Sequence, residues 1–312
     1  MTTRCGAAFW ITTMIAAGAC GRAASIRSPA PESPAPGSAA PPTDIYLYRF
    51  PRFTLGSRVF NITNRTGYDN QPSWDGNNRI LYTSEDGGQT DIYEISFETS
   101  RISKVTDTPE SEYSAAINPD GNGITVVRVE RDSTQRLWSF PKGGGAPSLI
   151  LPDIKPVGYF AWLDSTKIAL YVLGSPNTLR IGDTRTGTAR VVTTNIGRSL
   201  QRIPGGRRAS YVHRVGNKWM LETVDPIARA GGAFDVDTIA ALPDSADYVV
   251  WRSPTEIFTA AGSRLLRMRL PRKTWVQVDD LTERGIRRVS RLAMSPDGSR
   301  LALVAEEPTP KP

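Results

Sequence analysis

An internal repeat of about 44 residues constrains the fold of this chain more than any other feature of its sequence. Each unit contains an apolar run, a polar turn and a second apolar run. In the first unit, Trp74 ends the first run, Asp75-Gly76 begins the turn and residues 80–84 form the second run. The pattern recurs around Asn118-Pro119-Asp120-Gly121 and around Ser295-Pro296-Asp297-Gly298. Short β-branched and aromatic runs bounded by Asp-Gly turns are typical of β-hairpins. The repeat therefore predicts an array of small antiparallel sheets.

The spacing of the repeat indicates how many strands each unit contains. Successive anchor residues lie 43, 45, 41, 48 and 43 residues apart. This is the length of a four-stranded propeller blade, and the period-two pattern argues against a helical solenoid. The equivalent anchors, one for each unit, are Trp74, Ile117, Trp162, Ile203, Trp251 and Met294.

The two ends of the repeat region indicate how the array closes. Residues 43–50 match residues 90–97, the outer half of a unit, whereas residues 292–305 form an inner half alone. Joining the two halves completes a sixth unit and leaves few exposed strand edges. The sequence thus predicts an all-β, six-bladed propeller over residues 43–307, in which N-terminal outer strands complete the C-terminal blade, followed by a disordered tail at 308–312.

The N-terminal 42 residues have the composition of a targeting segment and a linker. Residues 1–19 combine Arg4 with a short apolar stretch that ends in small residues directly before Cys20, as in a bacterial lipoprotein signal. Residues 20–42 are rich in Pro, Ala and Ser and predict a disordered linker after the lipid-anchor cysteine. We expect an exported, membrane-anchored lipoprotein that faces the periplasm or the cell surface. The alternative is an ordinary signal peptidase site with Cys20 as a bystander.

The composition weighs against most enzyme classes. The chain has one histidine, His213, and both of its cysteines lie in the first twenty residues. It contains no G-x-S-x-G, H-E-x-x-H or Walker sequence, so we expect no catalytic residue and no cofactor. His213 falls in the expected second strand of the fourth blade, where a structural role is the simpler interpretation. Gly143-Gly144-Gly145 falls where outer strands turn, so a turn is the simpler interpretation than a phosphate-binding loop.

The loops that enter each inner strand are the candidate binding face, because in a propeller they gather at one mouth of the central channel. Four of them carry a tyrosine, and we expect a ring of aromatic and charged side chains that grips a peptide or a sugar chain. The alternative is that these tyrosines pack against neighbouring blades with their hydroxyls at the surface. The candidate residues are Tyr68, Asp69, Glu112, Tyr113, Tyr159, Arg198, Asp247, Tyr248, Arg288 and Arg291.

Oxygen ligands at this mouth leave an enzymatic alternative open. Some six-bladed propellers are hydrolases or lyases that hold a divalent metal with carboxylates and amides, and hard cations prefer such ligands. The residues that could converge as ligands are Asp69, Asn70, Glu112 and Asp247.

The net charge of +7 is unevenly distributed. Residues 69–112 hold ten acids against three bases, residues 198–218 hold six bases and no acid, and residues 264–300 hold ten bases against four acids. These sectors are either solvated blade edges or surfaces that face an anionic envelope polymer or lipid headgroups. Because the charge divides in this way, we expect no nucleic-acid partner.

The repeats resemble those of TolB-like six-bladed propellers, which carry a PD-type, WD-like repeat. The resemblance rests on Ser295-Pro296-Asp297-Gly298, Asn118-Pro119-Asp120-Gly121 and Asp91-Ile92-Tyr93, and it extends over residues 43–307. It implies a non-enzymatic protein-interaction module of the cell envelope, with an envelope protein or peptide as partner. TolB itself has an N-terminal α/β domain and no lipid anchor, so a Tol role does not follow. An envelope glycan is the alternative ligand.

Overall fold

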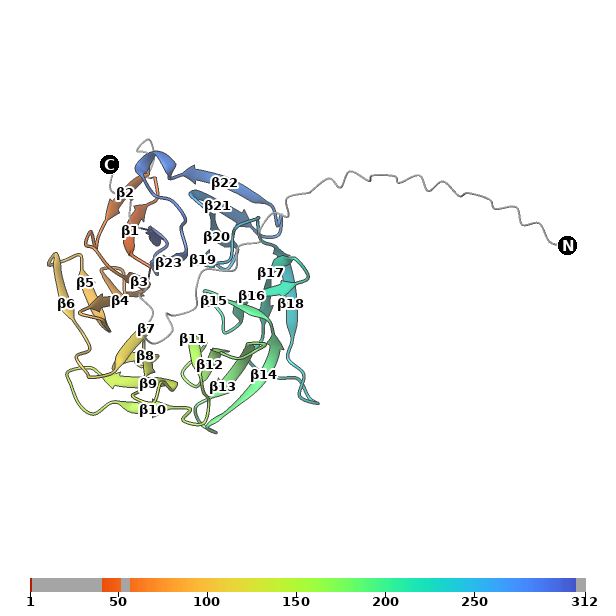
Figure 1. Cartoon of the computed structure of the whole chain (residues 1–312), viewed down its shortest axis with the longest axis horizontal. Helices are drawn as coiled ribbons and strands as arrows, with labels where there is room; N and C mark the ends of the chain where they lie inside the picture. The colour runs from red at the N-terminus through yellow and green to blue at the C-terminus, as the bar shows by residue number, and fades with distance from the viewer. Residues whose placement is uncertain (2–40, 52–56, 307–312) are drawn as a thin grey trace.

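The chain folds into six antiparallel sheets of four strands each, arranged around a central axis. The computed structural model describes Met1 and residues 41–51 and 57–306. Figure 1 shows the sheets as blades that follow one another around the ring in chain order. This confirms the predicted all-β, six-bladed propeller. The expected signal peptide, Cys20, almost all of the linker and the C-terminal tail lie outside the described residues. Within the described part, no helix is long and apolar enough to cross a membrane.

In blades one to three the chain runs from the channel outward, so each blade is a meander of four consecutive strands. Their strands are β3 (Asp69–Asp75), β4 (Arg79–Asp86), β5 (Gln89–Ser96) and β6 (Arg101–Lys104); β7 (Ser111–Ile117), β8 (Gly123–Val129), β9 (Gln135–Pro141) and β10 (Ser148–Ile150); and β11 (Val157–Trp162), β12 (Lys167–Val172), β13 (Thr178–Asp183) and β14 (Thr188–Thr194).

Blades four and five repeat this arrangement, and blade six combines strands from both ends of the chain in the order β2-β1-β24-β23. A single 3-10 turn, η1 (Thr282–Arg284), follows β22 in the described chain. The strands are β15 (Ile196–Arg202), β16 (Ala209–Val215), β17 (Lys218–Val224) and β18 (Val236–Ala241); β19 (Val249–Ser253), β20 (Glu256–Ala261), β21 (Arg264–Arg269) and β22 (Trp275–Asp280); and β1 (Thr43–Arg49), β2 (Arg58–Asn61), β23 (Arg291–Met294) and β24 (Arg300–Glu306).

The ring closes where β1 pairs with β24. The two strands are antiparallel and in register over their whole length, from Thr43 opposite Glu306 to Arg49 opposite Arg300. The turn between β23 and β24 also contacts blade one, because the Asp297 amide donates to Asn77 Oδ1 at 3.0 Å and Arg300 donates to the Asn77 carbonyl. Pairing the first and last strands leaves neither as a free edge at the junction.

Both faces of each blade are buried against its neighbours. Buried apolar side chains in the described chain form six clusters, and each lies at the interface between two adjacent blades, which we call a seam. In β24, Leu301 and Leu303 pack toward blade five, whereas Ala302 and Val304 pack toward blade one. Successive side chains of a strand point to opposite faces. The second strand of a blade, counted from the channel, is therefore largely apolar, because its alternate side chains pack into two different seams.

The side chains of the closing strand should contribute to the stability of the ring. Ile45 in β1 is fully buried in the seam between blades six and one. We expect Ile45→Ala to lower the free energy of unfolding by about 2–5 kcal/mol through lost burial and a residual cavity. Ile102→Ala, on the outer strand β6 where the side chain is 53% exposed, is the control and should change stability by less than about 0.5 kcal/mol. Chemical denaturation measures both, and equal effects would contradict this role of β1.

The Pro-Asp-Gly turn of blade six holds an ionised carboxylate. Burial opposes ionisation, but hydrogen bonds from the Ser295 hydroxyl and from Ser299 outweigh it and hold the pKa of Asp297 at about 2. A lowered pKa in the folded state stabilises the fold above the unfolded pKa, and this contribution is lost as pH falls from about 4 to about 2.

Asp297→Asn should remove part of this acid sensitivity. The variant is expected to be less stable than the parent at pH 7 and to lose less stability between pH 4 and pH 2, because its side chain does not titrate. Denaturant unfolding at a series of pH values between 7 and 2 measures the difference. Parallel pH profiles for the two proteins would show that Asp297 does not contribute.

Candidate functional site

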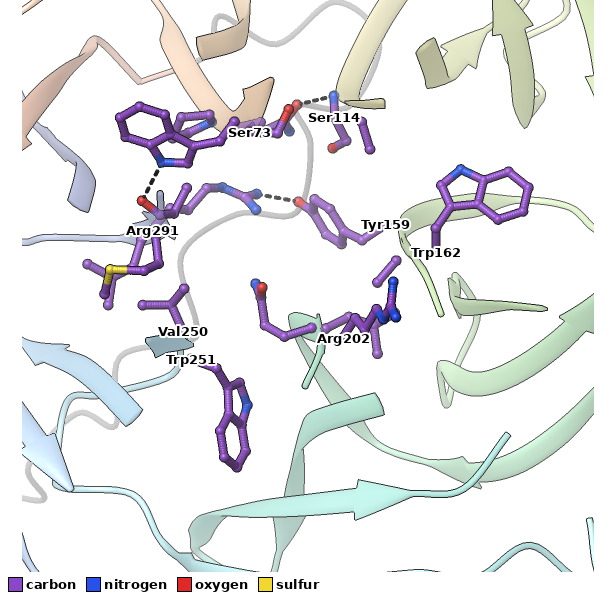
Figure 2. Close-up of a pocket in the computed structure, with 18 of the residues that line it drawn as sticks. Ser73, Ser114, Tyr159, Trp162, Arg202, Val250, Trp251 and Arg291 are labelled. Carbon is purple, nitrogen blue, oxygen red and sulfur yellow. Dashed lines mark hydrogen bonds between the residues drawn. The ribbon is translucent and has the colours of Figure 1, made fainter. Parts of the chain in front are cut away.

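The innermost strand of each blade faces the central channel, where the structure contains a cavity of about 640 Å³. All six inner strands contribute side chains to its wall (Figure 2). The repeat position three residues before the anchor lines the cavity in every blade. These residues are Gln71, Ser114, Tyr159, Leu200, Tyr248 and Arg291.

Irregular backbone in the inner strands shapes the wall. The register shifts by a bulge in β3 and again in β7, and the residues within these shifts, Gln71 and Ser114, adopt φ values of 55° and 54°. The Gln71 carboxamide oxygen accepts hydrogen bonds from the Ser114 amide and the Thr83 hydroxyl, each at 2.8 Å. Bulges redirect side chains and are frequent next to binding sites. Here they turn polar side chains toward the channel.

The end of the cavity where the inner strands finish is open to solvent, and we call it the open end. Arg202, Gly205 and Pro296 line the cavity there and are exposed. The Arg202 guanidinium donates to the Gly206 carbonyl at 2.8 Å and adds a positive charge at the entrance. Arg252 also lies in the wall and forms an ion pair with Glu256 at 3.4 Å.

Three tryptophans of the repeat, in blades one, three and five, line the cavity and also connect adjacent blades. The indole N–H of Trp74 donates to the Ala293 carbonyl at 2.9 Å, that of Trp162 to Thr125 Oγ1 at 3.1 Å, and that of Trp251 to Ser210 Oγ at 2.7 Å. Each bond reaches the preceding blade. Buried indoles usually need such a partner. Three of the six repeat anchors therefore connect adjacent blades by a hydrogen bond across a seam.

The opposite end, where the inner strands begin, is closed by the protein's own side chains. Arg291 of blade six reaches across the axis to blade three, where it donates to the Tyr159 hydroxyl at 2.8 Å (Figure 2). Its guanidinium lies 4.7 Å from the Tyr159 ring centroid and 5.8 Å from that of Tyr248. Tyr68 is buried beside them, and burial raises the pKa of Tyr68 while the nearby Arg291 partly offsets the rise. We call this the closed end.

A second arginine joins the closed end from blade four. Arg198 donates to the Ser290 carbonyl at 3.1 Å and lies 3.6 Å from a carboxylate oxygen of Asp247. Gln201 donates to the Tyr248 hydroxyl at 3.2 Å. The structure thus gathers six of the ten predicted binding-face residues at one end of the channel. They are Tyr68, Tyr159, Arg198, Asp247, Tyr248 and Arg291.

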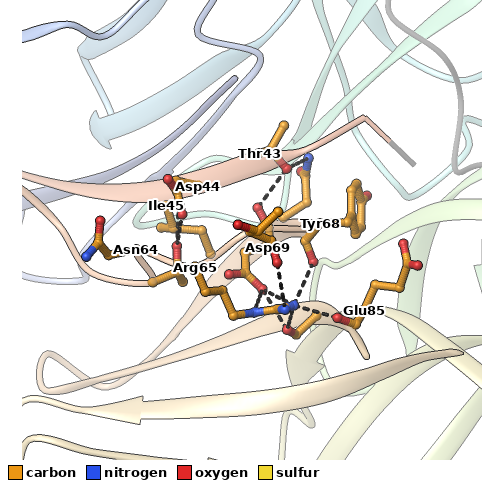
Figure 3. Close-up of polar contacts among 12 residues, drawn as sticks. Thr43, Asp44, Ile45, Asn64, Arg65, Tyr68, Asp69 and Glu85 are labelled. Atoms are coloured by element: carbon orange, nitrogen blue, oxygen red, sulfur yellow. Dashed lines mark hydrogen bonds and ion pairs between the residues drawn. The ribbon is translucent and has the colours of Figure 1, made fainter. Parts of the chain in front are cut away.

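Two of the predicted acids point away from this group. Asp69 is fully buried, where it accepts from Ser84 Oγ at 2.6 Å and pairs with Arg65 at 2.9 Å (Figure 3). Glu112 is equally buried and pairs with Arg128 at 2.9 Å. Burial raises the pKa of both carboxyls, and the neighbouring arginine in each case lowers it in part. Both acids are part of buried polar networks within the blades.

The other two predicted residues also lie elsewhere. Tyr113 is buried in the seam between blades two and three. Arg288 is exposed and pairs with Glu306 at the end of β24. The packing expected for the tyrosines thus holds for Tyr113, whereas the Tyr159 hydroxyl is bonded to a buried arginine rather than exposed at the surface.

The alternative metal ligands do not converge. Asp69, Glu112 and Asp247 each face an arginine of their own, and Asn70 donates to Thr43 Oγ1 at 3.3 Å. Among the described residues, no three His, Cys, Asp or Glu side chains gather as metal ligands would.

His213 lies in β16, the second strand of blade four. Its Nδ1 is 3.0 Å from Glu222 Oε2, which also accepts from the Tyr211 hydroxyl at 2.8 Å. The histidine is therefore part of a polar network within one blade and does not line the channel. Gly143-Gly144-Gly145 lies in the turn between β9 and β10, as the sequence predicted.

Sequence reasoning missed the polar residues Gln71 and Ser114 and the arginines at the open end. A usable signal was present, because the wall position lies three residues before every anchor. Counting back from the six anchors would have found one wall residue in each blade.

No protein-family model and no curated protein matches this sequence. Among solved structures, a TolB candidate from Agrobacterium tumefaciens superposes with a TM-score of 0.64 at 16% identity, covering 86% of this chain and 100% of that one. A chain of a nidogen/laminin complex gives a TM-score of 0.56 at 11% identity, covering 84% and 98%. Oligogalacturonate lyase in complex with manganese gives 0.50 at 12% identity, covering 75% and 68%. At these identities the likeness concerns the fold alone.

Removing the hydroxyl that faces Arg291 tests the closed end. We expect Tyr159→Phe to lower the free energy of unfolding by about 1–3 kcal/mol, because a buried guanidinium loses a hydrogen-bond partner. Tyr248→Phe is the matched control. Its hydroxyl is only partly buried and bonds a neutral amide, so the expected cost is below about 1 kcal/mol. The reverse order of the two effects in denaturant unfolding would contradict this arrangement.

Proposed function

We propose that this protein is a non-enzymatic binding module of the cell envelope whose channel holds a segment of a partner protein. The observation that carries the proposal is the cavity itself. It is open at one end and closed at the other, and its wall combines aromatic, aliphatic and arginine side chains. Concave, partly apolar sites with a few directed polar groups are the usual form of a binding site.

The chemistry of the wall favours binding over catalysis. Of the described residues that line the cavity, none is an aspartate, glutamate, histidine, cysteine or lysine. Those side chains include the usual general bases. Ser73, Ser114 and Ser295 line the cavity, but among the described lining residues there is no histidine, lysine or carboxylate to activate a serine as a nucleophile. Arginine, tyrosine and tryptophan recur instead, and these residues dominate the energetics of protein interfaces. The fold similarity to hydrolases and lyases does not supply a catalytic group to this wall.

The expected location supports an envelope role. A lipid on Cys20 would leave the propeller on a linker of about 20 residues, roughly 60 Å long if extended. That reach would let the open end meet partners near the membrane surface. The repeat motifs and the similarity in fold to TolB agree with this setting.

The lipid anchor can be tested independently of the channel. We expect Cys20→Ser to move the protein from the membrane fraction to the soluble fraction of the envelope, because one acyl-bearing residue provides the attachment. Cys5→Ser is the matched control and should leave the protein in the membrane fraction. Fractionation followed by mass spectrometry of the N-terminal peptide measures both. An unmodified Cys20 in the parent protein would remove the anchor from the proposal.

Site-specific photo-crosslinking tests the channel as the binding site. A photo-reactive amino acid in place of Arg202, at the open end, should yield a crosslinked protein product in intact cells. The same amino acid at Ile102, which is exposed on the outer strand β6, should not yield that product. Identical products from both positions, or none from position 202, would contradict binding through the channel.

A further inference from the structure

Arg291 is a buried cation for which the described residues provide no acid. The residue is 5% exposed, and none of the ion pairs in the described chain includes it. Its polar and ring contacts are the Tyr159 hydroxyl and the faces of Tyr159 and Tyr248. A buried charge is costly unless it is paired, so a guanidinium in this position calls for a reason other than packing.

Other hydrogen-bonding groups on the same wall have no partner in the described part of the chain. Arg291 Nε, Arg198 Nε, Gln71 Nε2 and Ser114 Oγ are buried in residues that line the cavity, and none of them makes a hydrogen bond to a described residue. Gln71, like Arg291, is 5% exposed. Three of the four are N–H groups that can only donate, so together they are suited to an acceptor. Buried groups of this kind are normally bonded, which makes their concentration in one cavity informative.

The charge of the wall has a single sign. The arginines that line the cavity are Arg198, Arg202, Arg252 and Arg291, and no acidic side chain is among the described lining residues. Arg198 and Arg252 each have a carboxylate partner behind the wall. Among the described residues neither Arg202 nor Arg291 has one, but Arg202 is exposed at the open end, so the buried uncompensated charge is that of Arg291 at the closed end. A cleft lined by one sign of charge concentrates ligands of the opposite sign.

We infer that the closed end is a carboxylate-binding site, in which Arg291, assisted by Arg198, Gln71 and Ser114, receives the C-terminal carboxylate of an extended peptide. The inference rests on the proposed function and names the end of the partner that the channel accepts. A channel closed at one end admits the end of a chain rather than the side of a loop. The planar guanidinium matches a carboxylate with two parallel hydrogen bonds.

The inner strands favour a peptide over a sugar acid. Each inner strand is the edge strand of its sheet, so backbone groups on its channel side have no strand partner among residues 41–51 and 57–306. An extended peptide can use such edges for main-chain hydrogen bonds. The indole N–H groups of Trp74, Trp162 and Trp251 are already bonded across the seams, so they are not available to sugar hydroxyls.

The test is an NMR titration that follows the chemical shifts of the Nε–H groups of Arg291 and Arg198 in the full chain labelled with ¹⁵N-arginine. Sodium acetate is the probe, with acetamide and sodium chloride at matched ionic strength as controls. We expect a saturable shift of the Arg291 signal with acetate alone. No saturable shift, or the same shift with acetamide or chloride, would overturn the carboxylate site.

Two variants and three further ligands complete the experiment. Arg291→Lys keeps the charge but loses the planar fork, and acetate affinity read at Arg198 should fall by about tenfold. Arg101→Lys, on the exposed outer strand β6, should leave it unchanged. Equal affinities in the two variants would overturn the role of Arg291.

N-acetyl-tetraalanine should bind more tightly than its C-terminal amide and more tightly than galacturonate. Tighter binding of galacturonate would overturn the peptide assignment.

The outcomes are separable from those of the proposed function. Crosslinking from position 202 reports on any protein partner at the open end and does not depend on Arg291. A crosslinked partner without an acetate response would overturn the carboxylate site alone. An acetate response without a crosslinked protein would contradict the protein-binding function and, with it, the peptide as the source of the carboxylate.

Discussion

Everything in this molecule depends on the antiparallel pairing of β1 with β24. The other five blades form from consecutive strands, but the ring exists only because the first strand of the repeat region completes the last blade. A circular array of sheets buries both faces of every blade, and an open array would expose two of them. The pairing therefore links the stability of all six seams to one junction between distant parts of the chain.

The same closure creates the channel and decides what lies in it. Six inner strands converge on the axis, so one side chain from each blade shares a small volume with five others. Part of the wall is apolar, and its residues Leu200, Val250 and Leu292 also pack in the seams. At the closed end, however, Arg291 and Tyr159 meet from opposite blades, and a positive charge lies where packing alone would favour an apolar residue. Stability and binding thus make different demands on the same ring of residues.

The sequence predicted the fold far better than the site. Turn motifs and regular anchors are local, so the blades could be counted, and the matching end segments showed how the ring closes. The side to which a residue points was harder to predict. Tyr68 and Asp69 are adjacent, yet the tyrosine joins the channel cluster and the acid bonds Arg65 and Ser84 inside the blade. Glu112 was misplaced in the same way, because bulges in the inner strands break simple alternation.

By itself, the sequence determined the period, the number of blades, the way the ring closes and the single histidine's place in a second strand. These follow from short-range patterns of apolar residues and turns. Only the tertiary structure decided which end of the channel is open, and that Arg291 reaches Tyr159 across the axis. The two residues are 132 positions apart and belong to different repeats. Their contact depends on the diameter of the closed ring, which no local pattern encodes.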